Sequence, residues 1–130
     1  MQIATRQFAD TLVVRPSGRV DHRSAAQFEA ALMPLLAQAG AANSALVLDF
    51  SGVEYISSVG LRVLMIAAEK MRSQQARFAV AALQTVVAEI FAISRFHRIL
   101  LVCTTLEDAL QQCSTAALAE YRQTGGSATP

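Results

Sequence analysis

The stretch Leu46–Met71, LVLDFSGVEYISSVGLRVLMIAAEKM, carries the signals that decide the fold. It opens with the apolar run LVLDF, whose length is typical of a buried strand. After Gly60 the apolar residues recur at helical spacing, at Leu61, Leu64, Met65, Ala68 and Met71. Two adjacent hydroxyls, Ser57 and Ser58, stand where this helix should begin. A strand followed directly by an amphipathic helix favours an α/β fold.

The segment before this stretch predicts two strands and a helix. QIATRQF and TLVVRPSGRV are β-type runs separated by Ala9-Asp10, which predicts a hairpin turn. Ser24 and Gln27 have the spacing of a capping box, and the apolar pattern that follows predicts a helix closed by Gly40, with Pro34 kinking it.

The segment after it continues the alternation. ARFAVAAL predicts a strand, QTVVAEIFAIS a short helix capped by Thr85, and RILLVC a last strand. TTLEDALQQCSTAALAEYR predicts one final helix, opened by Thr104 with Glu107 in capping-box spacing. The predicted order is β-β-α-β-α-β-α-β-α, with a partly parallel sheet. We expect one domain over residues 1–122 and a disordered tail over residues 123–130.

The composition of the chain argues against several classes of function, among them membrane-spanning and nucleic-acid-binding proteins. Hydrophobic residues make up 53% of the 130 residues, yet no apolar run reaches the ~18 residues of a membrane span. The start shows no secretory signal, so a cytoplasmic location is expected. The net charge of +1 and the scattered basic residues argue against direct binding of nucleic acid. Cys103 and Cys113 match no metal or redox motif and are expected to be structural thiols.

No catalytic constellation is visible, and the chain is not expected to be an enzyme. His22 and His97 are the only histidines, and the serine pair lacks the glycine spacing of a nucleophile elbow. No phosphate-binding loop or metal-ligand spacing occurs, so neither a cofactor nor a metal is expected. Asp21-His22 could form half of a dyad, but a role for Asp21 in ordering the turn before Ser24 is favoured.

The serine pair leaves two roles open. Either hydroxyl could cap the helix by accepting from a backbone N–H one turn ahead. A phosphate would also be accommodated at a helix N-terminus, where it would add nearly two negative charges to an apolar surface. The position is therefore suited to a phosphorylation switch.

At these residues the sequence resembles the STAS domain family, in particular bacterial anti-sigma factor antagonists. LVLDFSGVEYISSVGLRVL is similar to the family's core motif, SGRVDHRSAAQFEAAL to its segment before the first helix, and the chain from Arg77 to Leu110 to its C-terminal half. The resemblance covers about residues 8–120. It implies an α/β fold with a mixed sheet and helices packed mainly on one face.

The resemblance also implies a partner-switching function. An unphosphorylated antagonist of this family binds a cytoplasmic GHKL-type anti-sigma factor serine kinase and frees a sigma factor or other regulator. The kinase phosphorylates and releases the antagonist, and a phosphatase resets the cycle. The phosphoacceptor falls on Ser58, with Ser57 as a possible alternative, and the family's Asp-x-Ser falls on Asp49 and Ser51. The expected partner-binding residues are Asp21, Ile56, Ser57, Val59, Gly60, Arg62 and Val63.

Three features of the sequence depart from the family pattern, and two alternatives to this interpretation remain. Ser57 replaces a frequent aspartate, Val59 replaces a small or hydroxylated residue, and the segment Ser94–Arg98 is unusually basic, either as a solvated loop or as a partner-contact rim. The main alternative is a non-switching STAS subunit of a lipid-transport or stressosome-like assembly, in which the serines are caps only. A small-molecule or nucleotide sensor ranks lower. The sequence leaves the oligomeric state open.

Overall fold

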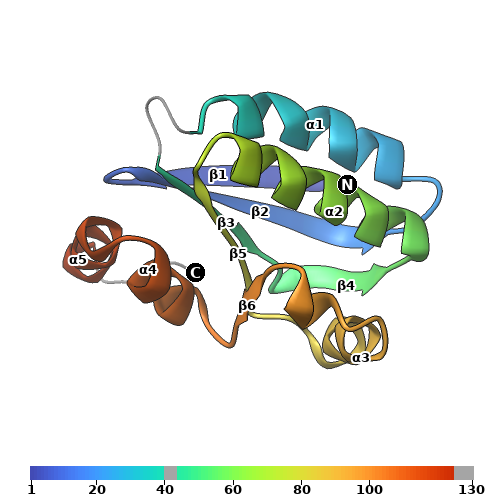
Figure 1. The fold of residues 1–130 in the computed structure, drawn as a ribbon. Helices are drawn as coiled ribbons and strands as arrows, with labels where there is room; N and C mark the ends of the chain where they lie inside the picture. Colours follow the sequence, from blue (N-terminus) through green and yellow to red (C-terminus); the bar gives the residue numbers. More distant parts are fainter. Residues whose placement is uncertain (40–43, 125–130) are drawn as a thin grey trace.

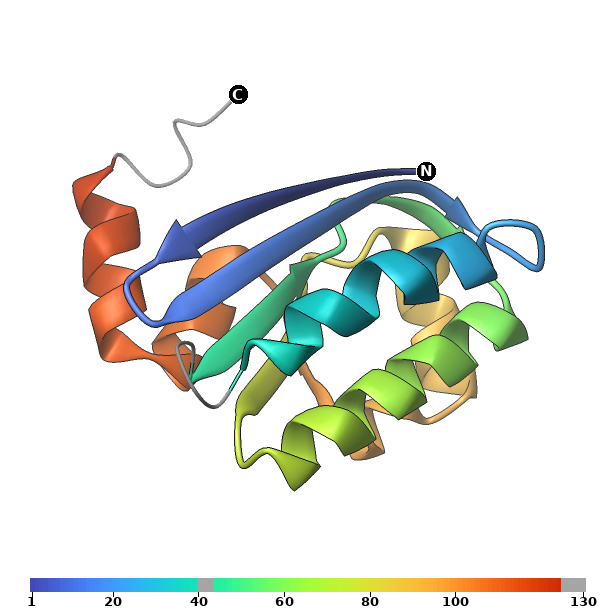
Figure 2. The same ribbon diagram turned by 90° about the horizontal axis from the view of Figure 1, so that it is seen from above.

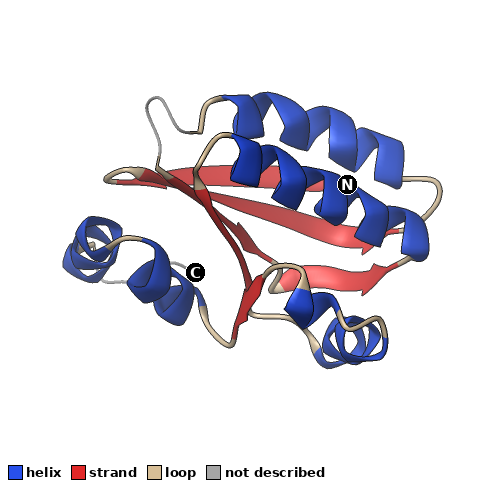
Figure 3. Cartoon of the chain, in the orientation of Figure 1, coloured by secondary structure: helices blue, strands red, loops and turns tan. Residues whose placement is uncertain are grey.

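A computed structural model describes residues 1–39 and 44–124 (Figures 1 and 3). The strands are β1 (Gln2–Phe8), β2 (Thr11–Val20), β3 (Ala45–Asp49), β4 (Gly52–Ile56), β5 (Arg77–Ala81) and β6 (Leu101–Cys103). The helices are α1 (Ala25–Ala37), α2 (Ser58–Ser73), α3 (Thr85–Ile93), α4 (Leu106–Cys113) and α5 (Thr115–Gln123), with a short 3-10 helix, η1 (Phe96–Arg98). The α/β class is confirmed. Gly40 and residues 125–130, where we expected a helix end and a disordered tail, lie outside the described residues.

The sheet is mixed, with the order β1-β2-β3-β5-β6. β1 and β2 form an antiparallel hairpin, whereas β2, β3, β5 and β6 run parallel. Ala9 makes the hairpin turn with a positive φ of 49°. β4 was not predicted: it pairs in parallel with the second half of β2, from Ser17 to Val20, and the register shifts between Gly18 and Arg19. This pairing places the end of β4 beside the end of β2.

Helices cover both faces of the sheet, and more of them lie on one face, as expected. In Figures 1 and 2, α1 and α2 lie side by side across the sheet, while α4 and α5 lie on its opposite side. The larger core joins α1, α2, α3 and η1 to the sheet around side chains such as Phe28, Phe50 and Phe91. A second core under α4 and α5 includes Phe8, Val47 and Leu110.

The predicted final helix is two helices. α4 ends at Cys113, and Ser114 then caps α5 by accepting from the N–H of Ala117 at 3.1 Å. The Ser114 hydroxyl also donates to Asp10 Oδ1 in the β1–β2 turn, at 2.5 Å. Since Ser114 has extended backbone angles there, it turns the chain so that α5 packs against β1. The tail boundary shifts as well, because Gln123 still belongs to α5.

Three residues predicted to cap helices make no side-chain cap bond. The cap of α4 is Thr105, which accepts from the N–H of Asp108 at 3.0 Å, and not Thr104. Thr85 is the first residue of α3 and makes no cap bond. Ser24 is the N-cap residue of α1, but its side chain makes no cap bond: its oxygen accepts from the N–H of Asp21 at 3.1 Å, and its hydroxyl donates to the Arg19 carbonyl at 2.6 Å. For Ser24, contacts with the end of β2 and the turn after it take the place of the local capping bond.

Candidate functional site

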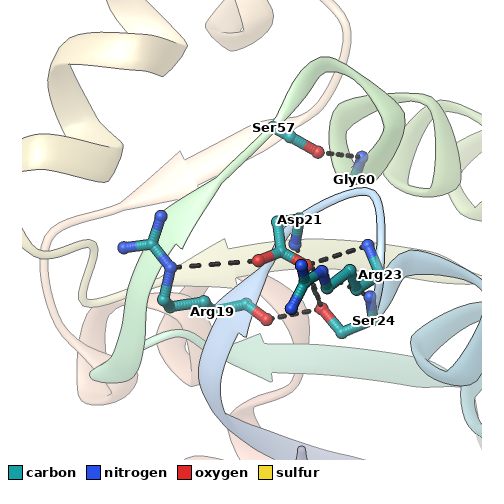
Figure 4. Close-up of polar contacts among 6 residues, drawn as sticks. All are labelled: Arg19, Asp21, Arg23, Ser24, Ser57 and Gly60. Atoms are coloured by element: carbon teal, nitrogen blue, oxygen red, sulfur yellow. Dashed lines mark hydrogen bonds and ion pairs between the residues drawn. The ribbon is translucent and has the colours of Figure 1, made fainter.

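The serine pair lies at the junction between β4 and α2. Ser57 is the N-cap of α2, with extended backbone angles, and its side chain accepts from the N–H of Gly60 at 3.3 Å (Figure 4). Its own N–H donates to the carbonyl of Val20 at 2.8 Å. The expectation that one serine caps the helix is therefore confirmed for Ser57.

Ser58 occupies the first position of α2 and is exposed. Within the described part of the chain its hydroxyl makes no hydrogen bond, in contrast to the hydroxyl of Ser57. Backbone N–H groups in the first turn of a helix lack intrahelical partners and carry a partial positive charge. Ser58 thus combines an accessible hydroxyl with surroundings that favour an anion.

Gly60 allows the close approach that creates this junction. A Cβ atom at Gly60 would lie 2.7 Å from side-chain carbons of both Ile56 and Val20. Such a distance is far inside van der Waals contact, so any larger residue would push α2 away from the ends of β2 and β4. Gly60 is buried, and its role is to let the helix start here.

Two residues expected to offer an apolar surface to a partner lie in the core instead. Ile56 is 1% exposed and Val63 is 3% exposed. Ile56 ends β4 and points to the larger core, and Val63 faces the same core from α2. Their role in partner binding is therefore corrected: they support the site from beneath and do not form its surface.

The exposed apolar surface comes from other residues of α2. Val59 is 45% exposed, Met65 48% and Ile66 37%. With Arg62, which is also exposed, these residues form what we call the outer face of α2. Met65 was expected on one apolar stripe with Leu61 and Leu64, which are buried, and Ile66 was not singled out. The helical spacing of residues 59, 62 and 66 could have identified Ile66.

Asp21 lies next to Ser57 because of strand register. Val20 pairs with Ile56, and Asp21 and Ser57 each follow directly. The Asp21 carboxylate accepts from the N–H groups of Arg23, at 2.9 Å, and Ser24, at 3.2 Å (Figure 4). The bond from Arg23 is the main reason why the pKa of Asp21 lies below its ordinary value. Asp21 orders the turn before α1, as expected, and holds a negative charge near the serines.

Asp49 and Ser51 lie at the other end of β4. Asp49 is 9% exposed and accepts from the N–H of Ser51 at 3.0 Å. The five residues of β4 span about 17 Å at ~3.3 Å per residue. The structure therefore does not bring the Asp-x-Ser motif to the serine pair.

The basic segment Ser94–Arg98 follows α3. It consists of a turn and the short helix η1. Phe96 is 3% exposed and anchors the segment in the larger core, while Arg95, His97 and Arg98 are exposed. Arg95 has a positive φ of 56°, which redirects the chain. The segment thus presents exposed basic side chains on a buried aromatic anchor, as both a solvated loop and a partner-contact rim require.

Comparison with known proteins places these features in a family. Residues 2–109 match the model of the STAS domain. BtrV of Bordetella bronchiseptica, which is named as an anti-sigma factor antagonist, is 33% identical over 116 residues, covering 89% of this chain and 97% of BtrV. The anti-sigma-F factor antagonist RsfB of Mycobacterium tuberculosis is 33% identical over 98 residues, covering 75% of this chain and 77% of RsfB.

The chain belongs to the STAS domain family.

A solved relative supports the fold. The crystal structure of an anti-sigma factor antagonist from Mycobacterium paratuberculosis matches this STAS domain with a TM-score of 0.77 at 28% identity, covering 85% of this chain and 92% of that one. Within the described ranges 1–39 and 44–124, no helix of the STAS domain could cross a membrane. No group of three acidic, cysteine or histidine side chains in those ranges could hold a metal ion.

The two cysteines of the STAS domain are free and buried. Burial raises the pKa of Cys113 to about 11 and also raises that of Cys103. Thiols that stay protonated at neutral pH are poor nucleophiles. Both cysteines pack in the core under α4 and α5, which agrees with the structural role expected for them.

Proposed function

We propose that this STAS domain is a cytoplasmic anti-sigma factor antagonist that switches partners through phosphorylation of Ser58. The observation that carries the proposal is the contrast between the two serines. Ser57 is half-buried and its hydroxyl caps α2, whereas the Ser58 hydroxyl is exposed and has no protein partner in the described residues. A kinase can reach Ser58 without breaking the cap of the helix.

The outer face of α2 is the surface to which the partner binds in this proposal. Val59 follows Ser58 directly, and Met65 and Ile66 lie further along the same helix. All three are exposed apolar side chains. Exposed apolar side chains that cluster on one helix face are typical of protein interaction sites. Arg62 and Asp21 supply charges of opposite sign at the rim, where charges govern specificity more than affinity.

The partner is an anti-sigma factor of the GHKL serine kinase class, and a phosphatase reverses the modification. The two relatives named as anti-sigma factor antagonists support this partner, and both match most of the chain. A phosphate on Ser58 would place nearly two negative charges beside Val59, which must lose water when the complex forms. A tenfold loss of affinity needs only about 1.4 kcal/mol. The domain acts by binding and is not itself an enzyme.

Site-resolved mass spectrometry tests the proposal. The protein is incubated with ATP and the serine kinase encoded nearest its gene, beside the variants Ser58→Ala and Ser57→Ala. We expect one phosphate that is absent only in Ser58→Ala. The affinity of the unmodified and phosphorylated proteins for that kinase, measured by calorimetry, should differ by at least about tenfold.

Two outcomes would contradict the proposal. A phosphate retained by Ser58→Ala and lost in Ser57→Ala would move the acceptor to Ser57. No phosphate with any serine kinase of the organism, together with a partner that stays bound through purification, would establish the fixed-subunit alternative.

A further inference from the structure

A cavity opens on the face of the sheet opposite to α1 and α2, away from the serine pair. Its volume is about 380 Å³, within the range of ~300–1,000 Å³ that small-molecule pockets occupy. It lies where β1, β2 and the end of β3 meet the helices of the second core. The lining residues on which the argument rests are Phe8, Val13, Arg15, Asp49, Leu106 and Tyr121.

One side of the cavity is lined by apolar side chains. Phe8 and Tyr121 meet edge to face, with ring centroids 5.4 Å apart, and this contact fixes α5 against β1. Val13 and Leu106 extend the same surface. The guanidinium of Arg6 lies 4.7 Å from the centre of the Phe8 ring, so this arginine is already engaged by the wall. The wall suits the apolar body of a small ligand.

The polar side of the cavity carries two opposite charges on neighbouring strands. Val14 pairs with Leu48, so the next residues, Arg15 and Asp49, lie opposite each other. Arg15 comes two residues after Val13, and Asp49 two residues after Val47. Because side chains two residues apart in a strand point to the same face, Arg15 and Asp49 lie on the face of the second core. Among the described residues, however, no ion pair joins Arg15 to Asp49. Two complementary charges are therefore adjacent but unpaired.

Asp49 is the unusual member of this pair because it is 91% buried, with an exposed fraction of 9%. One of its oxygens accepts from the N–H of Ser51, and no second partner is found within the described residues. Every fully buried polar side-chain atom in the described residues has a hydrogen-bond partner. Since the second oxygen of Asp49 has none, it is not fully buried, and it opens to the cavity that Asp49 lines. Burial of a carboxylate is costly unless a donor compensates it, and a ligand donor would do so.

We propose that this cavity binds a free α-amino acid with an apolar side chain. The ammonium group donates to Asp49, the carboxylate pairs with the Arg15 guanidinium, and the side chain packs on Phe8, Val13 and Tyr121. A simple anion would meet the Asp49 carboxylate, and a simple amine would meet Arg15, whereas a zwitterion satisfies both. The inference does not depend on phosphorylation of Ser58, because the cavity and the serine pair lie at opposite ends of β4.

The test is an NMR titration in which the backbone amide signals of the protein are followed. Three probes are used that share the same apolar group and differ in their charges. L-phenylalanine carries both charges, 3-phenylpropionate lacks the ammonium group, and phenethylamine lacks the carboxylate. We expect saturable shifts in the millimolar range with L-phenylalanine, centred on Val13, Arg15 and Ser51. Each single-charge probe should bind at least about tenfold more weakly.

Variants of the protein test whether Arg15 and Asp49 bind the two charged groups of the ligand. Arg15→Gln, at an exposed position, should weaken L-phenylalanine binding about tenfold, and Asp49→Asn should do the same. Arg98→Gln removes an exposed arginine outside the cavity and should leave binding unchanged. The proposal is overturned if L-phenylalanine causes no saturable shift, if either single-charge probe binds as tightly, or if Arg15→Gln, still folded by its amide spectrum, binds L-phenylalanine like the unmodified protein.

Discussion

The N–H of Ser57 donates a 2.8 Å hydrogen bond to the carbonyl of Val20, at the two strand ends that form the site. It continues the pairing of β2 with β4 by one step, so that the turn containing Asp21 and the start of α2 are held together. The serine pair therefore sits on a junction whose geometry is set by the sheet and not by α2 alone. Two of the predictions below concern this junction, and two concern groups elsewhere in the fold, Asp10 in the β1–β2 turn and the buried cysteines.

The first prediction concerns Gly60. Replacement by alanine puts a Cβ atom 2.7 Å from carbons of Ile56 and Val20, both in the core. Overpacking of this kind destabilises a protein by about 1–3 kcal/mol. Urea unfolding should show that loss for Gly60→Ala. Ser58→Ala, at an exposed neighbouring position, should change stability by less than about 0.5 kcal/mol, and equal stability of the two variants would refute the close approach.

A second prediction separates the two serines by stability. Ser57→Ala removes the side-chain acceptor of the Gly60 N–H and should cost about 1 kcal/mol, as loss of an N-cap does. Ser57→Asp restores an acceptor and should recover most of this loss. Chemical denaturation of Ser57→Ala beside Ser58→Ala measures the difference. If the two alanine variants lost the same stability, Ser57 would not be the cap.

The third prediction concerns pH and Asp10. The Asp10 carboxylate accepts from the hydroxyls of Ser114 and Ser44, and these bonds, Ser114 first, lower its pKa. A folded pKa below the unfolded value of about 3.9 means that the carboxylate stabilises the fold above that value. This stability is lost as pH falls through the folded pKa.

Thermal unfolding between neutral and strongly acidic pH checks this. Asp10→Asn should unfold at a lower temperature than the unmodified protein at pH 7, and the gap should narrow below the folded pKa. Glu89→Gln, at an exposed position on α3, is the matched control and should show no such convergence. A constant gap at all pH values would mean that ionisation of Asp10 is not the cause.

The fourth prediction concerns thiol reactivity. Burial raises the pKa of Cys113 to about 11, and since thiolates are the reactive form, the folded protein should react slowly with a thiol reagent at pH 8. Both Cys103 and Cys113 should react rapidly once the protein is unfolded in urea. Time-resolved labelling with Ellman's reagent measures the two rates. Rapid labelling of the folded protein would show that the core under α4 and α5 opens readily.

Much of the fold could be predicted because its signals are local. The buried run of β3, the apolar period of α2 and the alternation of strands with helices each depend on residues close together in the chain. β4 was missed since GVEYI is short, and only pairing with the end of β2 makes it a strand. The break between α4 and α5 was missed for a related reason: Ser114 bonds to Asp10, 104 residues away in the chain.

In the candidate site, too, some features follow from local sequence and others from tertiary structure. The sequence by itself determined that two serines stand at the start of an amphipathic helix and that one of them caps it, because capping acts over three residues. Only the tertiary structure decided which serine is the cap, that Ile56 and Val63 are buried, and that Met65 is exposed. It alone also placed Arg15 opposite Asp49 beside the cavity. The physical reason is that exposure and strand pairing depend on what packs across the sheet, which local spacing does not encode.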